Sequence, residues 1–219
     1  MTAGQLVIWR HGNTDWNREG RVQGGADVPL NDLGRQQAAA AAAALAALRP
    51  TAVVSSDLRR AADTAAALAS LTGLPVRGDA RLRERSFGSW QGRLMTDIRR
   101  DHPEEHARWR AADPDPGCGI EPLDTLQRRA VAALCDAAAG GGTTVVVTHG
   151  GTARYAVAGL LDWPAPVWGT LGGLGNCAWA VLAPRGRGWQ LLAYNVTPAA
   201  PPRPADPQAV EPTGARGRR

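Results

Sequence analysis

The chain has 219 residues, of which 44% are hydrophobic, and a formal net charge of +5. This length suits one well-buried domain better than two. All 25 basic residues are arginine, so mechanisms that use a lysine as nucleophile or Schiff base are excluded. Cys118, Cys135 and Cys177 form no CxxC pair, which argues against a disulfide framework or a thiolate zinc site and favours buried, unreactive thiols.

The two ends of the sequence differ in character. The N-terminus lacks the basic and apolar segments of a signal peptide, and no apolar run reaches the roughly 18 residues of a membrane span. We therefore expect a cytoplasmic protein that does not enter the membrane. Residues 198–219 contain six prolines and four arginines, and we expect a disordered tail there, which leaves residues 1–197 as the folded domain.

The positive charge by itself does not identify a partner. No helix-turn-helix or RNA-binding aromatic motif accompanies it, so nucleic acid is not the expected partner, although binding through the arginine-rich tail stays an alternative. The forked donors of arginine suit a small anionic phosphate ester instead.

Short β-branched runs alternate with helical segments along the chain, a pattern typical of an α/β fold. In chain order we expect a strand at 5–9, a helix through 36–48 capped by Asn31 or Asp32, a strand at 51–55, a helix at 58–71, a strand at 74–76, a strand at 143–148, a helix at 152–161, and a hairpin of strands at 178–182 and 189–194. The expected architecture has three layers, helix–sheet–helix, with a mainly parallel sheet and an antiparallel edge strand.

Three other features receive structural interpretations. Residues 102–106 place two histidines at i, i+4 spacing without the HExxH order, which indicates a solvated helix with Pro103 in its first turn rather than a zinc site. The glycine-rich segment 170–176 lacks the lysine of a nucleotide-binding loop and is expected to be a tight connection that brings Asn176 near the pocket. Of eight tryptophans, we expect three in the core and three at a substrate cleft: Trp9, Trp90 and Trp179 in the first group, and Trp16, Trp163 and Trp168 in the second.

Polar groups follow three of the predicted strands. Arg10-His11-Gly12 comes after the first strand, Ser56 to Arg60 after the second, and His149-Gly150-Gly151 after the strand at 143–148. Ligands of α/β sheets bind beyond the carboxyl ends of the strands. The sequence therefore predicts a phosphate-binding site at this edge, with two of the four histidines in it.

Four blocks of the sequence, in this order, resemble the motifs of the histidine phosphatase superfamily, also called phosphoglycerate-mutase-like. They are RHGNT at 10–14, SSDLRRA at 55–61, LRERSFGSWQG at 82–92 and THGG at 148–151. Asn17, Gln23 and Gly24 match further positions, and the blocks cover nearly all of the chain before the tail. Four blocks in order are a far more specific signal than one.

The resemblance implies a phosphomonoester hydrolase that works through a phosphohistidine, with no metal and no cofactor. His11 is the implied nucleophile, and a hydrogen bond from its other ring nitrogen to a backbone carbonyl would fix its tautomer. Arg10, Arg60 and His149 are implied to bind the phosphoryl group, while Arg59 is an exposed helix residue. The other implied phosphate- or substrate-binding residues are Asn13, Asn17, Gln23, Gly24 and Gly150.

Glu84 matches the family residue that protonates the leaving group and then activates water. Its alternative is an ordinary ion pair with Arg81, Arg83 or Arg85.

Several functional alternatives stay open within the resemblance. The superfamily contains phosphoglycerate mutases as well as phosphatases, and residues 93–123 lie where the family builds a lid over the pocket. This short lid favours access of water, hence a phosphatase. The segment 168–179 is similar to glucosyl-3-phosphoglycerate phosphatases of actinobacteria, which implies that substrate. A catalytically idle phosphate-binding relative is the further alternative, and a homodimer would be unsurprising in this superfamily.

Overall fold

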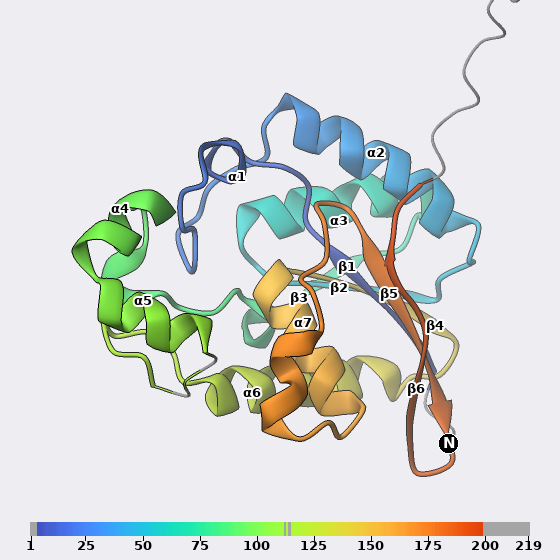
Figure 1. Ribbon diagram of the computed structural model, residues 1–219. Coiled ribbons are helices and arrows are strands. Elements are labelled where there is room, and N and C mark those ends of the chain that lie inside the picture. The colour runs from blue at the N-terminus through green and yellow to red at the C-terminus, as the bar shows by residue number, and fades with distance from the viewer. Residues whose placement is uncertain (1–3, 112, 114, 199–219) are drawn as a thin grey trace, which may run out of the picture.

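The computed structural model describes residues 4–111, 113 and 115–198, which form a six-stranded sheet between two layers of helices (Figure 1). The sheet has the order β3-β2-β4-β1-β5-β6. The strands are β1 (Gln5–Arg10), β2 (Ala52–Ser55), β3 (Val76–Gly78), β4 (Thr143–Thr148), β5 (Trp179–Arg185) and β6 (Gly188–Val196). The α-helices are α1 (Asp15–Glu19), α2 (Asp32–Ala46), α3 (Arg59–Thr72), α4 (Met95–Asp101), α5 (Pro103–Arg110), α6 (Leu123–Ala138) and α7 (Gly150–Leu160). Three short 3₁₀ turns lie at Ala80–Leu82, Gly88–Trp90 and Ala165–Thr170.

The consecutive apolar residues of the central strands, Leu6 to Trp9 and Val145 to Val147, are all buried, so both faces of the sheet are covered. Along β1, Leu6 and Ile8 point into one hydrophobic cluster with α6 and α7, and Val7 and Trp9 point into the other with α2 and α3. In Figure 1, α2 and α3 accordingly lie above the sheet and α6 and α7 below it.

The predicted fold class is confirmed. Strands β1, β2, β3 and β4 pair in parallel, while β5 pairs antiparallel with β1, and β6 antiparallel with β5. The strand prediction at 143–148 matches β4 at both ends. The predicted strand at 74–76 is wrong in its bounds, since β3 runs over Val76–Gly78; Pro75 has no backbone N–H to donate to a ladder.

Helices α4 and α5 lie in the segment that was expected to form a lid, project to the left of the sheet in Figure 1, and have a small core of their own. That core contains Trp90, Val22, Ile98 and Ile120. Pro103 begins α5, as predicted, but the description of this helix as solvated is wrong at His106. The His106 ring is buried and lies 5.7 Å from the ring of Trp109, because the apolar side of this short helix faces the lid core.

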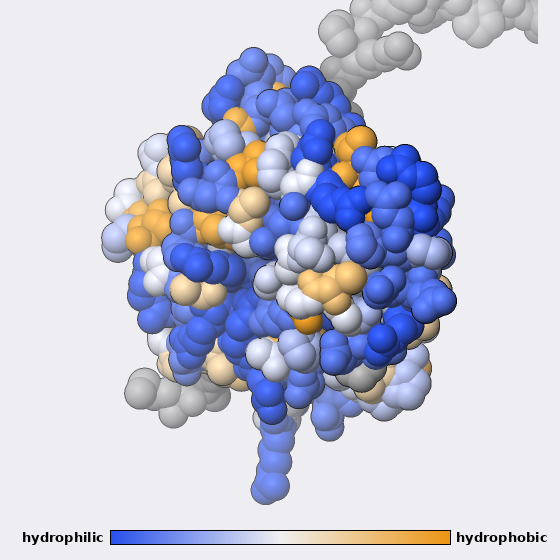
Figure 2. Space-filling view, turned by 90° about the vertical axis from the view of Figure 1, so that its left-hand side faces the viewer, coloured by the Kyte–Doolittle hydropathy of each residue, from blue (hydrophilic) through white to orange (hydrophobic). Residues whose placement is uncertain are grey.

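The tryptophan predictions are confirmed for the core, since Trp9, Trp90 and Trp179 are all buried. The expected burial of the cysteines holds for Cys177, but Cys135 is exposed on α6. In the described part of the chain, no helix is long and apolar enough to cross a membrane. The face that carries α4 and α5 is mostly hydrophilic, with small separate hydrophobic patches (Figure 2). The expected disordered tail lies, from residue 199 on, outside the described residues and stays a prediction.

Candidate active site

The three predicted strand ends lie together at one edge of the sheet. Strand β4 is flanked by β1 and β2, and the register places Arg10 beside Thr148 and Ser55 beside Val147. The next residues of β1 and β4, His11 and His149, are therefore level with each other, and Ser56, after β2, lies one position before His149 in the register. The His11 backbone N–H donates to the Thr148 carbonyl at 3.0 Å, which ties the two histidine segments together.

His11 is held as a neutral imidazole with one defined nitrogen free. Its Nδ1 lies 2.7 Å from the carbonyl oxygen of Gly12, as expected, so Nδ1 carries the proton and donates it there. Nε2 is then unprotonated and carries a lone pair. Burial lowers the pKa of His11 well below its ordinary value of 6.5, and the positive charges of Arg10 and Arg60 lower it further. The ring can thus offer an unprotonated nitrogen at neutral pH without any base to deprotonate it.

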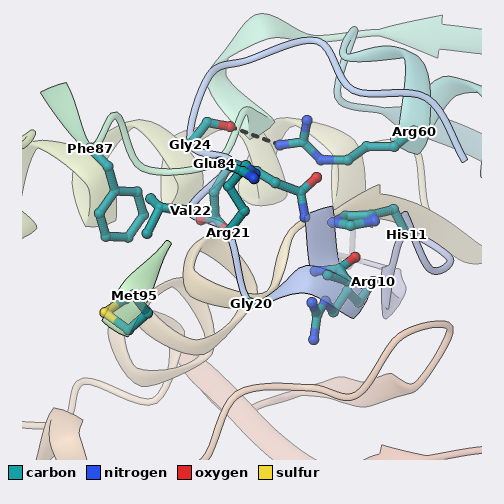
Figure 3. A pocket seen from close by; sticks show the side chains of 12 residues that line it. Arg10, His11, Gly20, Arg21, Val22, Gly24, Arg60, Glu84, Phe87 and Met95 are labelled. Atoms are coloured by element: carbon teal, nitrogen blue, oxygen red, sulfur yellow. Dashed lines mark hydrogen bonds between the residues drawn. The ribbon is translucent and has the colours of Figure 1, made fainter. Parts of the chain in front are cut away.

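Arg10 and Arg60 bring two guanidinium groups into the site without an ion-pair partner in the described chain. Arg60 is fully buried and donates from Nη1 to the Ala26 carbonyl at 2.6 Å and from Nη2 to the Gly24 carbonyl at 2.8 Å (Figure 3). Arg10 donates from Nη1 to the Leu174 carbonyl at 2.6 Å. The Nε atoms of both are buried and lack a partner.

These unused donors have an electrostatic consequence. Burial lowers the pKa of Arg10 and brings that of Arg60 down to about 10, which measures how poorly the surroundings solvate the two charges. Backbone carbonyl oxygens accept hydrogen bonds from some of the N–H groups of each guanidinium and fix its orientation. They do not neutralise its positive charge. Such a pair of buried, oriented cations is a binding site for a compact anion with several oxygens.

His149 lies directly behind His11, with the two ring centroids 5.1 Å apart, and it is fully buried. Its Nε2 lies 2.8 Å from the hydroxyl oxygen of Ser56, and its Nδ1 is buried without a partner. Burial and the charge of Arg60 lower its pKa well below the ordinary value. His149 does not itself line the cavity described below.

Glu84 is fixed by four hydrogen bonds at the N-terminus of α7. Its Oε1 accepts from the backbone N–H of Arg85 and of Thr152 and from the Thr152 hydroxyl, and its Oε2 accepts from the Gly151 N–H, over 2.9–3.1 Å. Gly151 permits this approach, because a Cβ there would lie 2.7 Å from Oε1. The alternative interpretation of Glu84 is wrong: Arg81 pairs with Asp79 and Asp136, Arg83 with Asp57, and the Arg85 side chain with the Glu121 carbonyl.

These groups surround a cavity of about 310 Å³, shown in Figure 3. It is lined by Arg10, His11, Asn17, Gly20, Arg21, Val22, Gln23, Gly24, Arg60, Glu84, Phe87 and Met95. The side-chain oxygen of Asn17 accepts hydrogen bonds from the Thr14 N–H at 3.2 Å and from Asn176 Nδ2 at 3.2 Å. Its amide nitrogen is therefore the free end, which makes Asn17 a neutral donor. The Gln23 side-chain oxygen is buried without a partner.

Two predicted binding residues lie elsewhere. Asn13 does not line this cavity, because its side chain accepts a hydrogen bond from Asn31 and donates one to Asn176. Gly150 lines a neighbouring cavity instead, and a Cβ there would lie 3.3 Å from Arg10 Nε. Asn13 thus braces the loop that carries His11, and Gly150 leaves room for the Arg10 guanidinium.

The expectation that Trp16, Trp163 and Trp168 line the cleft is wrong for this cavity, which none of them lines. Trp168 packs on Tyr155, and its ring N–H donates to the Trp163 carbonyl at 2.7 Å. Asn176, by contrast, does approach the site as expected, since its Nδ2 also donates to the His11 carbonyl at 3.1 Å.

Sequence reasoning missed several contributors to the site. The sequence pattern assigns no role to Ser56 or Thr152, although they contact His149 and Glu84 respectively. Thr64 accepts a hydrogen bond from the Gly12 N–H and donates one to the Arg60 carbonyl, which links the nucleophile loop to α3. A hydroxyl residue one position after a strand is the signal that could have found Ser56.

One group of possible metal ligands exists among the described residues: His102, Glu105 and Cys118, whose ligand atoms lie within 4.8 Å of one another. Arg93 donates to His102 Nε2 at 2.7 Å, so this nitrogen is occupied and a positive charge lies beside it. Both features disfavour a cation, and the group lies outside the cavity of His11.

The comparison with known families decides what this site belongs to. Residues 6–197 match the model of the histidine phosphatase superfamily (branch 1). The chain belongs to this superfamily. The family prediction made from the four sequence blocks is thus confirmed. The prediction that the chain is a phosphoric monoester hydrolase is confirmed with it.

Individual histidine phosphatases resemble the chain over most of its length. It is 43% identical over 193 residues to a glucosyl-3-phosphoglycerate phosphatase of Mycobacterium tuberculosis, covering 84% of this chain and 86% of that one. It is 40% identical over 157 residues to a metal-independent phosphoserine phosphatase of Arabidopsis thaliana, covering 68% and 66%. A solved mycobacterial glucosyl-3-phosphoglycerate phosphatase in complex with VO3 superposes with a TM-score of 0.84 at 40% identity, covering 89% of this chain and 100% of that one.

Proposed function

We propose that this histidine phosphatase hydrolyses glucosyl-3-phosphoglycerate, with His11 as nucleophile and without a metal ion. One observation carries the mechanism: a neutral imidazole with a free Nε2 lies in a cavity with two buried guanidinium groups that have no anionic partner. The Glu84 carboxylate lies near both groups without forming an ion pair with either, and a phosphate ester would supply the paired oxygens that they lack.

In the first half-reaction, His11 Nε2 attacks phosphorus, a P–N bond forms and the ester P–O bond breaks. Arg10 and Arg60 donate to the non-bridging oxygens, where charge is concentrated in the transition state. Asn17 adds a neutral donor. His149 does not line the cavity, so we assign it a supporting role beside the His11 ring, whose centroid lies 5.1 Å from its own.

The leaving oxygen takes a proton from Glu84 as the ester bond breaks. In the second half-reaction, water attacks the phosphohistidine, loses its proton to Glu84, and releases inorganic phosphate as the P–N bond breaks. The four donors around Glu84 hold its carboxylate in one orientation, so no rotation is needed between the two steps. This rigidity supports a double role for one residue.

The substrate assignment is supported by the similarity to the glucosyl-3-phosphoglycerate phosphatases and by the size of the site. A cavity of about 310 Å³ accommodates a phosphorylated metabolite rather than a protein side chain on a folded surface. Val22, Phe87 and Met95 give one wall an apolar character, which suits the carbon skeleton of the ester.

The test is phosphate release in the presence of EDTA from a panel of monoesters, with a mutase assay in parallel. The panel contains glucosyl-3-phosphoglycerate, 3-phosphoglycerate, phosphoserine and p-nitrophenyl phosphate. We expect release that His11→Ala abolishes, with the highest kcat/KM for glucosyl-3-phosphoglycerate. Strong inhibition by EDTA would refute the metal-free mechanism. A folded protein that hydrolyses no ester would refute the phosphatase assignment, and a better substrate would replace the one proposed.

A further inference from the structure

A second, smaller cavity adjoins the site of His11. It has a volume of about 140 Å³ and shares Phe87 with the first cavity. Gly150 and Gly151 line it, and the same two glycines contact Arg10 and Glu84. The small cavity therefore begins within one residue of the proposed catalytic groups, and a substrate bound there has a second compartment within reach.

Arg85 makes this compartment a candidate anion site. The residue lines the small cavity and is only 2% exposed. Its Nε donates to the Glu121 carbonyl at 2.7 Å, but its Nη2 is buried and has no partner. The Glu121 carboxylate lies near it but forms its ion pair with Arg129, at 2.7 Å. Leaving a buried guanidinium nitrogen without an acceptor is unfavourable, and an anion bound there would satisfy it.

Arg154 faces the same compartment from α7. Its Nε donates to the Trp168 carbonyl at 3.2 Å, and its guanidinium lies over the Tyr155 ring, 5.2 Å from the centroid. Within the described ranges, no residue accepts a hydrogen bond from its two terminal nitrogens. Both arginines are thus held at Nε and keep their terminal nitrogens for a ligand.

The chemistry of the compartment limits the ligand. Two guanidinium groups in a volume of about 140 Å³ fit a small anion with planar paired oxygens better than a second bulky phosphate. We propose that Arg85 and Arg154 bind the carboxylate of a phosphorylated glyceric acid while Arg10 and Arg60 bind its phosphoryl group. This inference rests on the proposed function and names the feature by which the enzyme selects among phosphomonoesters.

A matched pair of substrates isolates the carboxylate. 3-Phosphoglycerate and glycerol 3-phosphate share the phosphoryl group and the three-carbon chain, and they differ only in a carboxylate against a hydroxymethyl group at C1. We would measure kcat/KM for both with the wild-type chain and with Arg85→Gln and Arg154→Gln. Arg128→Gln is the control, since Arg128 is an exposed arginine on α6 that pairs with Asp124.

We expect kcat/KM for 3-phosphoglycerate to fall roughly 10- to 150-fold in each variant, because each variant loses one charge-assisted hydrogen bond to the carboxylate. The value for glycerol 3-phosphate should change less than threefold, and the control should change neither. Equal losses on the two substrates, or no loss on either, would overturn the inference. If Arg85→Gln does not fold, as judged by circular dichroism, Arg154→Gln decides alone.

A failure of the proposed function would look different, because the wild-type chain would then hydrolyse neither substrate. In that case calorimetric binding of the two compounds to the full chain decides. Tighter binding of 3-phosphoglycerate that Arg154→Gln abolishes would support the carboxylate site. Equal affinities in the wild-type chain would overturn it.

Discussion

Replacing Glu84 by glutamine keeps the shape of the side chain but changes what its two terminal atoms can do. Four donors point at the carboxylate, three at Oε1 and one at Oε2. A glutamine can place its oxygen at only one of these positions. The lower-energy arrangement keeps the oxygen at the three donors and turns the NH₂ group toward the Gly151 N–H, where two donors then face each other at about 3.0 Å.

The two consequences of Glu84→Gln have different sizes. Leaving the Gly151 N–H without an acceptor at the start of α7 costs about 1–3 kcal/mol of unfolding free energy. Removing the proton donor and acceptor should lower the rate by about 10²–10⁴-fold where the leaving group needs protonation. Aryl phosphates with good leaving groups need little protonation, so phosphorylation of His11 by them should slow far less.

The assay is a burst and steady-state series over alkyl and aryl phosphates of increasing leaving-group pKa, combined with urea unfolding. We expect the ratio of wild-type to variant burst rates to rise steeply along the series. Thr152→Val is the matched control, since it removes a hydroxyl that contacts both Glu84 Oε1 and the Arg83 carbonyl and keeps the carboxylate. It should lower stability by a similar amount without dependence on the leaving group. A flat ratio for Glu84→Gln across the series would refute the role of Glu84 as the acid.

Two further predictions concern pH and the lid. Because the folded pKa values of His11 and His149 lie well below 6.5, the folded chain binds fewer protons than the unfolded one below that pH, and stability falls with acidification. Between pH 7 and pH 6, the free energy of unfolding measured with urea should fall by about 0.7 kcal/mol for each histidine. An equally large fall in His11→Ala would contradict this prediction. Trp90→Ala should lower the free energy of unfolding by about 3–5 kcal/mol, and we expect rapid proteolysis between residues 93 and 122 as a result. Protease resistance equal to that of the wild type would argue against a lid held by this side chain.

Much of the fold could be predicted because its signals are local. The continuous apolar run at Thr143–Thr148 gives β4 at both ends, and Asn31 caps α2 through a hydrogen bond to the Gly34 N–H, as expected. Helices α1 and α4 were missed, because 5 and 7 residues are too short to show a helical period, and α6, with 16 residues, was also not predicted. The bounds of β3 depended on pairing with β2, which local sequence does not specify.

The sequence by itself determined which types of side chain meet at the site. Residues that follow parallel strands of one sheet meet at one edge of it. The sequence alone therefore predicts that Arg10, His11 and His149 lie close together. It also excluded a lysine nucleophile, since the chain contains no lysine.

Only the tertiary structure decided which groups remain free to act. Asn13 and Asn17 lie four residues apart and look alike in sequence, yet the first is used to brace a loop and the second faces the cavity. Arg83 and Arg85 flank Glu84, but one pairs with Asp57 at the surface and the other is buried without an anion. A residue's function depends on whether its donors are already satisfied, and these partners come from segments distant in the chain.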